Sequence, residues 1–328
     1  MLAALLTTLL FATSAICGYR TATKIGGLEA NFWRITLATL LLTLWAYTFG
    51  SGFAGAPLWF MLSGFLGIGV GDSAYFQALP RLGSRRTVLL CQCLTAPFAA
   101  IIEWLFLGTK LHFPELVCIA IILMGVAIAL APADHLVTTP RAWEIGIAAC
   151  ILSAGGAAFG AVLIRKGFAV AETLGPAPDA GTTGYQRVLG GILIPAIGLL
   201  VIKWKSAYAH GGPFEAKTLQ ITKDKWRTLW PWVLANALAG QTLGVTCMQW
   251  ALKTTSAGVV TAIIATTPVV LLPMTWMVER EKVSFRSAAG AVIAVAGVIG
   301  LCAPEVIHKL IGLTSHSGTF HHAALAIS

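Results

Sequence analysis

Four charged residues lie inside strongly apolar stretches of this chain: Arg34, Asp72, Glu103 and Arg187. At the centre of a lipid bilayer each charge costs about 2.5–3.5 kcal/mol, so such residues pair with one another or line a polar solute's path. Arg34 and Asp72 are predicted to lie about 8–10 Å below one membrane face, and Glu103 and Arg187 near the other. We therefore predict two ion pairs, Arg34–Asp72 and Glu103–Arg187, one toward each mouth of a gated pathway.

A simpler interpretation of three of these residues stays open. The two arginines and Glu103 can extend along apolar surface and place their charges at the membrane interface. Asp72 has a short side chain that cannot reach water from its predicted depth without a partner or a hydrated cavity. The sequence therefore favours Asp72 as a pathway residue with a gating or proton-coupling role.

An uncharged polar residue adds to this pathway. Gln92 falls on the same helical face as Glu103, which would align two polar side chains along one predicted span. A face of this kind is expected to line the cavity of a transporter. The alternative, that Gln92 bonds a neighbouring helix, stays equally open.

Two prolines occupy nearly matching places in the two halves of the chain, Pro97 and Pro268. A proline inside a helix removes a backbone donor, which would free the carbonyl four residues earlier, at Cys93 and at Ile264. Freed carbonyls at mid-depth can bind substrate. Membrane helices also tolerate proline for packing reasons, so both interpretations stay open.

Sequence patterns typical of enzymes and metal sites are absent. The chain contains no HExxH or GxSxG motif, and its seven cysteines all fall within predicted spans, where they act as small apolar residues. The net charge of +9 is scattered through short loops instead of gathering on a soluble surface. We therefore predict no enzymatic activity, no cofactor, no metal and no nucleic-acid partner.

The elements that must position these residues are membrane-spanning helices. Hydrophobic residues make up 57% of the 328 residues and charged residues 11%, with a mean hydropathy of +0.81. A helix needs about 20 apolar residues to cross the hydrocarbon layer. Ten such stretches are predicted, at 2–19, 29–49, 57–79, 86–107, 113–132, 143–165, 184–202, 229–251, 257–278 and 285–304.

Segments 57–132 and 229–304 look like two copies of one unit. The shift that places Gln77 on Gln249, here called the repeat shift, also aligns several other identical residues, and a shorter upstream shift places Arg34 on Arg187. Each copy contributes five spans, and an odd number inserts the second copy upside down, as in the inverted repeats of secondary transporters.

The predicted fold is therefore an all-α integral membrane protein of ten transmembrane helices, arranged as two inverted five-helix repeats. We predict four segments along the chain. They are a first repeat at 1–132, a linker at 133–142, a second repeat at 143–304, and a polar tail at 305–328 that is expected to be disordered.

Several short motifs resemble the EamA family of the drug/metabolite transporter superfamily. They are Leu10-Phe11-Ala12 followed by Arg20, Phe32-Trp33-Arg34, Tyr75-Phe76-Gln77-Ala78-Leu79, and Leu107-Gly108. The chain departs from the family pattern at Thr109, where an acidic residue is common. The resemblance implies ten helices, two five-helix repeats, a central cavity and the movement of small metabolites such as amino acids.

These observations predict a secondary transporter that moves a small metabolite, such as an amino acid, by alternating access, with export as the expected direction. The alternatives are a nucleotide- or lipid-linked phosphate carrier, for which only Arg34 and Arg187 could hold phosphate, and a channel. The predicted partners are a small-molecule substrate and the lipid bilayer of a bacterial inner (plasma) membrane. A coupling proton and a homodimer stay open.

Two arguments about orientation disagree. Positively charged residues concentrate in the loops opposite the termini, which by the positive-inside rule places both termini outside. The family resemblance implies termini in the cytoplasm. The orientation of the chain therefore stays open.

Overall fold

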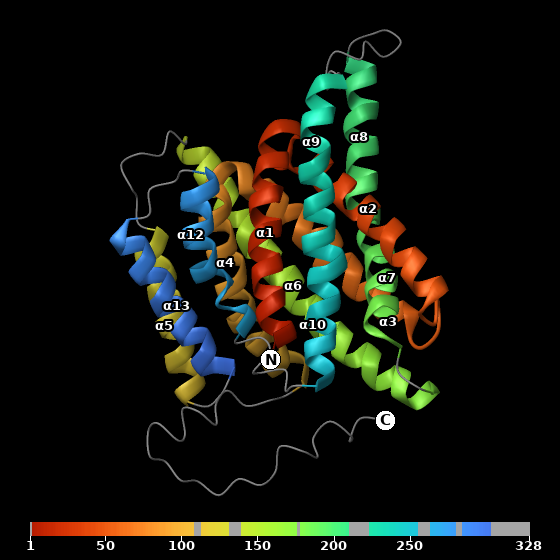
Figure 1. Cartoon of the computed structure of the whole chain (residues 1–328). Coiled ribbons are helices and arrows are strands. Elements are labelled where there is room, and N and C mark those ends of the chain that lie inside the picture. Colours follow the sequence, from red (N-terminus) through yellow and green to blue (C-terminus); the bar gives the residue numbers. More distant parts are fainter. Residues whose placement is uncertain are drawn as a thin grey trace, which may run out of the picture.

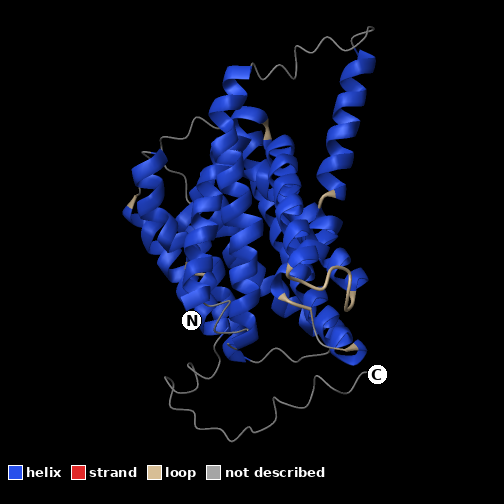
Figure 2. Cartoon of the chain, turned by 45° about the vertical axis from the view of Figure 1, so that its right-hand side comes forward, coloured by secondary structure: helices blue, strands red, loops and turns tan. Residues whose placement is uncertain are grey.

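A computed structural model of the chain describes residues 2–107, 113–130, 139–175, 178–209, 223–254, 263–279 and 284–302. Within these ranges the chain forms helices joined by short loops, and no strand is present in them (Figures 1 and 2). The helical elements are α1 (Leu2–Ile25), α2 (Gly27–Thr48), α3 (Pro57–Gly64), η1 (Phe65–Asp72), α4 (Ser73–Leu107), α5 (Phe113–Leu130), α6 (Pro140–Leu174), α7 (Ala180–Gly191), α8 (Leu193–Ala209), α9 (Lys223–Asn236), η3 (Ala237–Thr242), α10 (Leu243–Thr254), α12 (Thr267–Glu279) and α13 (Phe285–Cys302).

The outer surface of the bundle is apolar. Leu40 and Leu44, one turn apart on α2, are each 64% exposed. Among the residues that the structure describes, three helical stretches are long and apolar enough to cross a membrane: Leu2–Ile25, Pro140–Leu174 and Ala180–Ile202. An apolar outer surface with every backbone bond satisfied inside helices suits a lipid solvent. The chain is an all-helical integral membrane protein, and the total of ten spans stays a prediction.

Gly83 divides α4 into two helical parts. Its backbone has φ 80° and ψ 163°, a conformation that glycine adopts far more readily than other residues. A Cβ at this position would meet nothing within 4 Å, so the requirement for glycine comes from the backbone and not from space. The chain therefore kinks at Gly83, between the parts of α4 that correspond to the predicted spans 57–79 and 86–107.

Within the described ranges, two π-helical segments interrupt central helices. One, η1, lies between α3 and α4, and the other, η3, lies between α9 and α10. The repeat shift carries Phe65, the first residue of η1, onto Ala237, the first residue of η3. Segments of this kind are rare and occur mostly at functional sites.

Helices α5 and α13 lie side by side and pack closely through glycines (Figure 1). A Cβ on Gly125 would lie 2.4 Å from the Ala294 nitrogen, and one on Gly297 would lie 3.0 Å from the Ile122 nitrogen. As the residue number rises along α5, the number of the contacting residue falls along α13, so the two helices are antiparallel. The repeat shift exchanges the two contacts, because it carries Gly125 onto Gly297 and Ile122 onto Ala294.

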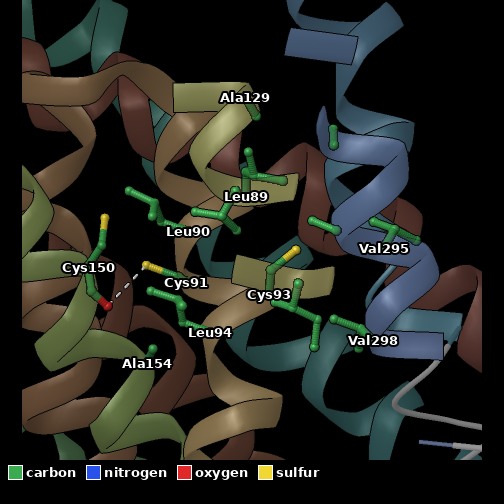
Figure 3. Close-up of a cluster of buried hydrophobic side chains, with 14 of the residues drawn as sticks. Leu89, Leu90, Cys91, Cys93, Leu94, Ala129, Cys150, Ala154, Val295 and Val298 are labelled. Atoms are coloured by element: carbon green, nitrogen blue, oxygen red, sulfur yellow. Dashed lines mark hydrogen bonds between the residues drawn. The ribbon is translucent and has the colours of Figure 1, made fainter. Parts of the chain in front are cut away.

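The largest apolar core lies between α4, α5, α6 and α13. Cys93 of α4 lies toward Val298 of α13 in this cluster, and Leu90 lies on the side toward Cys150 of α6 (Figure 3). On the side toward α6, the Cys91 thiol lies 3.8 Å from the carbonyl oxygen of Cys150, to which it donates (Figure 3). These thiols pack as small apolar groups inside the core.

Candidate functional site

Helix α2 meets the junction of η1 and α4 at a partly buried ion pair. The Arg34 Nη2 atom lies 2.6 Å from Asp72 Oδ2, and it also donates to Asn31 Oδ1 over 2.9 Å. Arg34 is 5% exposed, and its guanidinium carbon lies 4.8 Å from the centre of the Phe76 ring. The ion pair expected from predicted depth is thus present, and its role in gating stays a prediction.

Helix η3 reaches the same carboxylate. Gln241 Nε2 donates to Asp72 Oδ2 over 2.6 Å, while Asn31 Nδ2 donates to Ser73 Oγ over 3.2 Å. We call Asn31, Arg34, Asp72, Ser73 and Gln241 the central node. These bonds connect four helical elements. Three of them, α2, η1 and α4, belong to the predicted first repeat, while η3 belongs to the second.

A second contact between the predicted repeats lies beside the central node. Ser14 Oγ of α1 lies 2.7 Å from Asn236 Oδ1, at the end of α9. A Cβ on Gly240 would lie 2.6 Å from Ser14 Oγ and 3.3 Å from Arg34 Nη1. Glycine at this position therefore lets η3 approach both α1 and the Arg34 guanidinium.

Arg187 of α7 is buried on the other side of η1. It is 8% exposed, and its Nη2 atom lies 3.6 Å from the position that a Cβ on Gly67 would occupy. Among the residues that the structure describes, none forms a salt bridge or hydrogen bond with Arg187, and its Nε is buried without a partner. The Asp72 charge acts on it only from a longer distance.

The expected partner of Arg187 was Glu103. The backbone of Glu103 belongs to α4, but its side chain lies outside the described residues. The Glu103–Arg187 pair therefore stays a prediction.

The two buried arginines have related surroundings. Arg34, on the second predicted span, approaches Gly240 in η3, and Arg187, at the corresponding place in the second copy, approaches Gly67 in η1. Each arginine thus lies against the π-helical segment of the other predicted repeat. The two arginines differ in their acidic partner, because the repeat shift carries Asp72, the partner of Arg34, onto Gly244.

Tyr75 lies one turn after Asp72 at the meeting point of three apolar clusters. The centre of its ring lies 5.8 Å from that of the Phe76 ring, over which the Arg34 guanidinium lies. Sequence reasoning missed Tyr75, Asn31 and Gln241 as site residues. A polar amide at the middle of the predicted span 229–251 was the available signal for Gln241.

The remaining predicted pathway residues lie elsewhere in α4 and α12. Gln92 is partly buried and Pro97 is buried in α4, and no hydrogen bond joins Gln92 to the central node in the described part of the chain. Pro268 is the second residue of α12, so it lies in a first turn where proline is well tolerated. The Ile264 carbonyl that it was expected to free accepts a hydrogen bond from the Thr267 hydroxyl instead.

One end of the bundle is closed by a network around Asp179, the N-cap of α7. Asp179 Oδ1 accepts from the Gly181 nitrogen over 2.9 Å and from Trp45 Nε1 over 3.0 Å. Burial raises the pKa of Asp179, but hydrogen bonds from Thr182, Trp45 and Gly181 outweigh it and hold the pKa below 3.8. The Ser51 nitrogen donates to Thr182 Oγ1 over 3.0 Å and fastens the loop after α2 to α7.

Comparison with known proteins gives a family and a similar fold. The model of the EamA-like transporter family matches residues 1–131 and 144–303. A solved structure titled only "Crystal structure of protein" is 15% identical with a TM-score of 0.60, and the alignment covers 94% of this chain and 97% of that one. At this identity the likeness concerns the fold alone. No curated protein matches the sequence.

Proposed function

Since this chain belongs to the EamA-like transporter family, we propose that it is a secondary transporter that exports a small metabolite, such as an amino acid, by alternating access. Membership makes it a transporter of the drug/metabolite type with a small-molecule substrate. The substrate, the direction and the mechanism are the proposed part. A bacterial plasma membrane is the proposed location.

The observation that carries the proposal is the central node. A carrier that rocks one repeat against the other needs contacts between the repeats that break and reform around a midplane site. Gln241 of η3 bonds to Asp72, and Asp72 also bonds to Arg34 of α2. Side-chain bonds of this kind can be exchanged without unfolding a helix, because each involves only a few polar atoms.

The arrangement of the two copies supports the same mechanism. The contacts between α5 and α13 exchange under the repeat shift, and the two π-helical segments begin at matching positions. A two-fold axis in the membrane plane produces contacts of this kind, and such an axis lets two similar halves swap conformations. The same substrate site would then open to either side in turn.

The experiment is counterflow of labelled amino acids and related metabolites into liposomes that contain the purified protein. We expect unlabelled substrate inside the liposomes to drive transient accumulation of label, as an alternating carrier requires. A conductive leak without counterflow would contradict the carrier mechanism and favour a channel.

A coupling proton is tested by the Asp72→Asn variant in the same assay. If Asp72 carries the proton, a pH gradient drives uptake by the wild type and no longer drives uptake by the variant. Counterflow without a gradient would persist in the variant. Normal gradient-driven transport by Asp72→Asn across pH would exclude this role for the carboxylate.

A further inference from the structure

We propose that Arg187 binds the anionic group of the transported molecule and that Arg34 does not. The inference rests on the proposed transport function and narrows its substrate class. It predicts small molecules that carry a carboxylate or a phosphate, as anions or zwitterions, and it excludes molecules that are only cationic.

The first argument is the burial of a charge that no described residue pairs with. Arg187 is 8% exposed, and its Nε has no hydrogen-bond partner. None of the residues that the structure describes lies within ion-pairing distance of its guanidinium. A buried arginine without a counter-ion is costly, and an anionic ligand would supply the missing charge and hydrogen bonds.

The second argument is the contrast with Arg34. The two arginines occupy corresponding places, but Arg34 has the Asp72 carboxylate at 2.6 Å and the Asn31 amide oxygen at 2.9 Å. The positive charge of Arg34 is therefore already balanced inside the protein. The repeat shift places Gly244 where a matching acid for Arg187 would stand, so no acid among the described residues balances the Arg187 charge beside η1.

The third argument is the glycine surface beside Arg187. Glycines of α6 lie against Gly67 of η1, since a Cβ on Gly160 would lie 3.1 Å from the Gly67 Cα atom. A Cβ on Gly67 would come within 3.6 Å of Arg187 Nη2 and 3.7 Å of the Gly156 carbonyl oxygen. Because residue 67 is glycine, it places no side chain over the Arg187 Nη2 atom. The guanidinium has a planar array of donors that matches a carboxylate or phosphate in two-point fashion.

The placement also predicts how a substrate is oriented. Asp72 ends η1, the segment whose Gly67 lies beside Arg187 Nη2, and both described bonds to the Asp72 carboxylate use Oδ2. A zwitterion with its anionic group on Arg187 can direct its ammonium group toward the negative side of the central node. A cation alone would meet the uncompensated positive charge of Arg187.

The test compares charge variants of one skeleton in the counterflow assay. Alanine, leucine and phenylalanine are each offered with the corresponding amine, which lacks the carboxylate, and the corresponding acid, which lacks the amino group. Phosphate esters of the matching alcohols distinguish phosphate from carboxylate. We expect counterflow from the amino acids, the acids or the phosphate esters, and none from the amines.

The Arg187→Gln variant tests the residue itself. Loss of a charge-assisted hydrogen bond weakens binding, so the half-saturating concentration of acid-bearing compounds should rise by at least about tenfold. Arg187→Lys should recover part of this lost affinity. The matched control is Arg165→Gln, which removes an equal charge from the exposed surface of α6 and should leave the affinity unchanged. Thermal unfolding of each purified variant checks that it is folded.

The outcomes separate the two proposals. Equal counterflow of amines and acids would overturn the role of Arg187 and leave the transport proposal standing. This comparison uses the wild-type protein, so it holds even if Arg187→Gln fails to fold. An equal loss for all compounds in Arg187→Gln would also overturn it, because a residue that only positions helices slows every substrate alike. No counterflow for any compound would remove the transport proposal and this inference together.

Discussion

At the scale of single residues, one carboxylate oxygen connects two otherwise separate polar side chains. Asp72 Oδ2 accepts from Arg34 and from Gln241, both over 2.6 Å. Inside an apolar bundle such bonds are strong because the effective dielectric constant is low, and unpaired polar atoms are costly for the same reason. Removing different buried amides should therefore have opposite effects, according to whether each has a partner.

Gln241→Leu should lower stability, and Gln249→Leu should not. Gln241 donates to a charged oxygen, and the loss of such a bond costs about 1.5–3 kcal/mol. Gln249 is 2% exposed, and neither of its amide atoms has a partner within the described residues, so leucine should be neutral or stabilising there. Thermal unfolding of the two purified variants measures the difference, and equal losses would contradict the assigned bonding.

At the scale of helical elements, close packing depends on positions where a side chain has no room. Glycines along α5 and α13 bring the two backbones together, as small residues do at many membrane helix interfaces. Whether a glycine is needed at a given position can be judged from the atoms that a Cβ would meet there.

Gly125→Ala should destabilise the protein by about 1–3 kcal/mol, the usual effect of overpacking. Its Cβ would lie 2.4 Å from a backbone nitrogen of α13, which cannot move without moving the helix. The matched control is Gly155→Ala in α6, where a Cβ meets nothing within 4 Å. Alanine should be neutral or stabilising there because its helix propensity is higher. A similar loss of stability in both variants would contradict the predicted steric difference.

Asp179 at the start of α7 makes stability depend on acid pH. Its pKa is lower in the folded protein than its ordinary value of 3.8, so its contribution is fully present above about pH 4 and is lost as the pH falls through the folded pKa. Asp179→Ala should lower stability by about 0.5–2 kcal/mol at neutral pH, as loss of an N-cap does. It should also flatten the decline below pH 4 in pH-dependent unfolding. An unchanged acid profile would exclude this contribution.

At the scale of the whole molecule, alternating access requires each end of the bundle to open in turn. At one end the loop after α2 is held to α7 by the bond from Ser51 to Thr182. At the other end Arg20 of α1 donates to the Val278 carbonyl of α12 over 2.9 Å and lies over the Trp232 ring. Both contacts join the predicted first repeat to the second, so each is a candidate for the contact that closes its end of the bundle.

A cross-link between Ser51→Cys and Thr182→Cys should arrest transport. A short bifunctional thiol reagent would hold this end closed, and a cleavable linker should restore counterflow after reduction. Each single-cysteine variant treated with the same reagent is the control for labelling itself. Transport that continues with the cross-link in place would contradict a role for this end in opening.

Much about the molecule was determined by the sequence alone. Apolar composition predicted a helical membrane protein, because lipid requires every backbone polar group to be bonded within its own helix. Regular helical rise converts sequence position into depth, and this conversion predicted that Arg34 and Asp72 lie at one level. Short motifs predicted the transporter family, which the match over almost the whole chain confirms.

Only the tertiary structure decided which side chains meet at a given depth. Helices that are apolar on most faces can rotate without a large change in buried apolar surface, so periodicity does not fix their facing residues. Gln241 reaches Asp72 across 169 positions of sequence, and the π-helical segments that help to place both residues had no sequence signal that we could identify. Long-range packing, and not local sequence, brings the Asp72 carboxylate to Arg34 and neutralises its charge. The same packing brings glycine backbone to Arg187, which has no described partner.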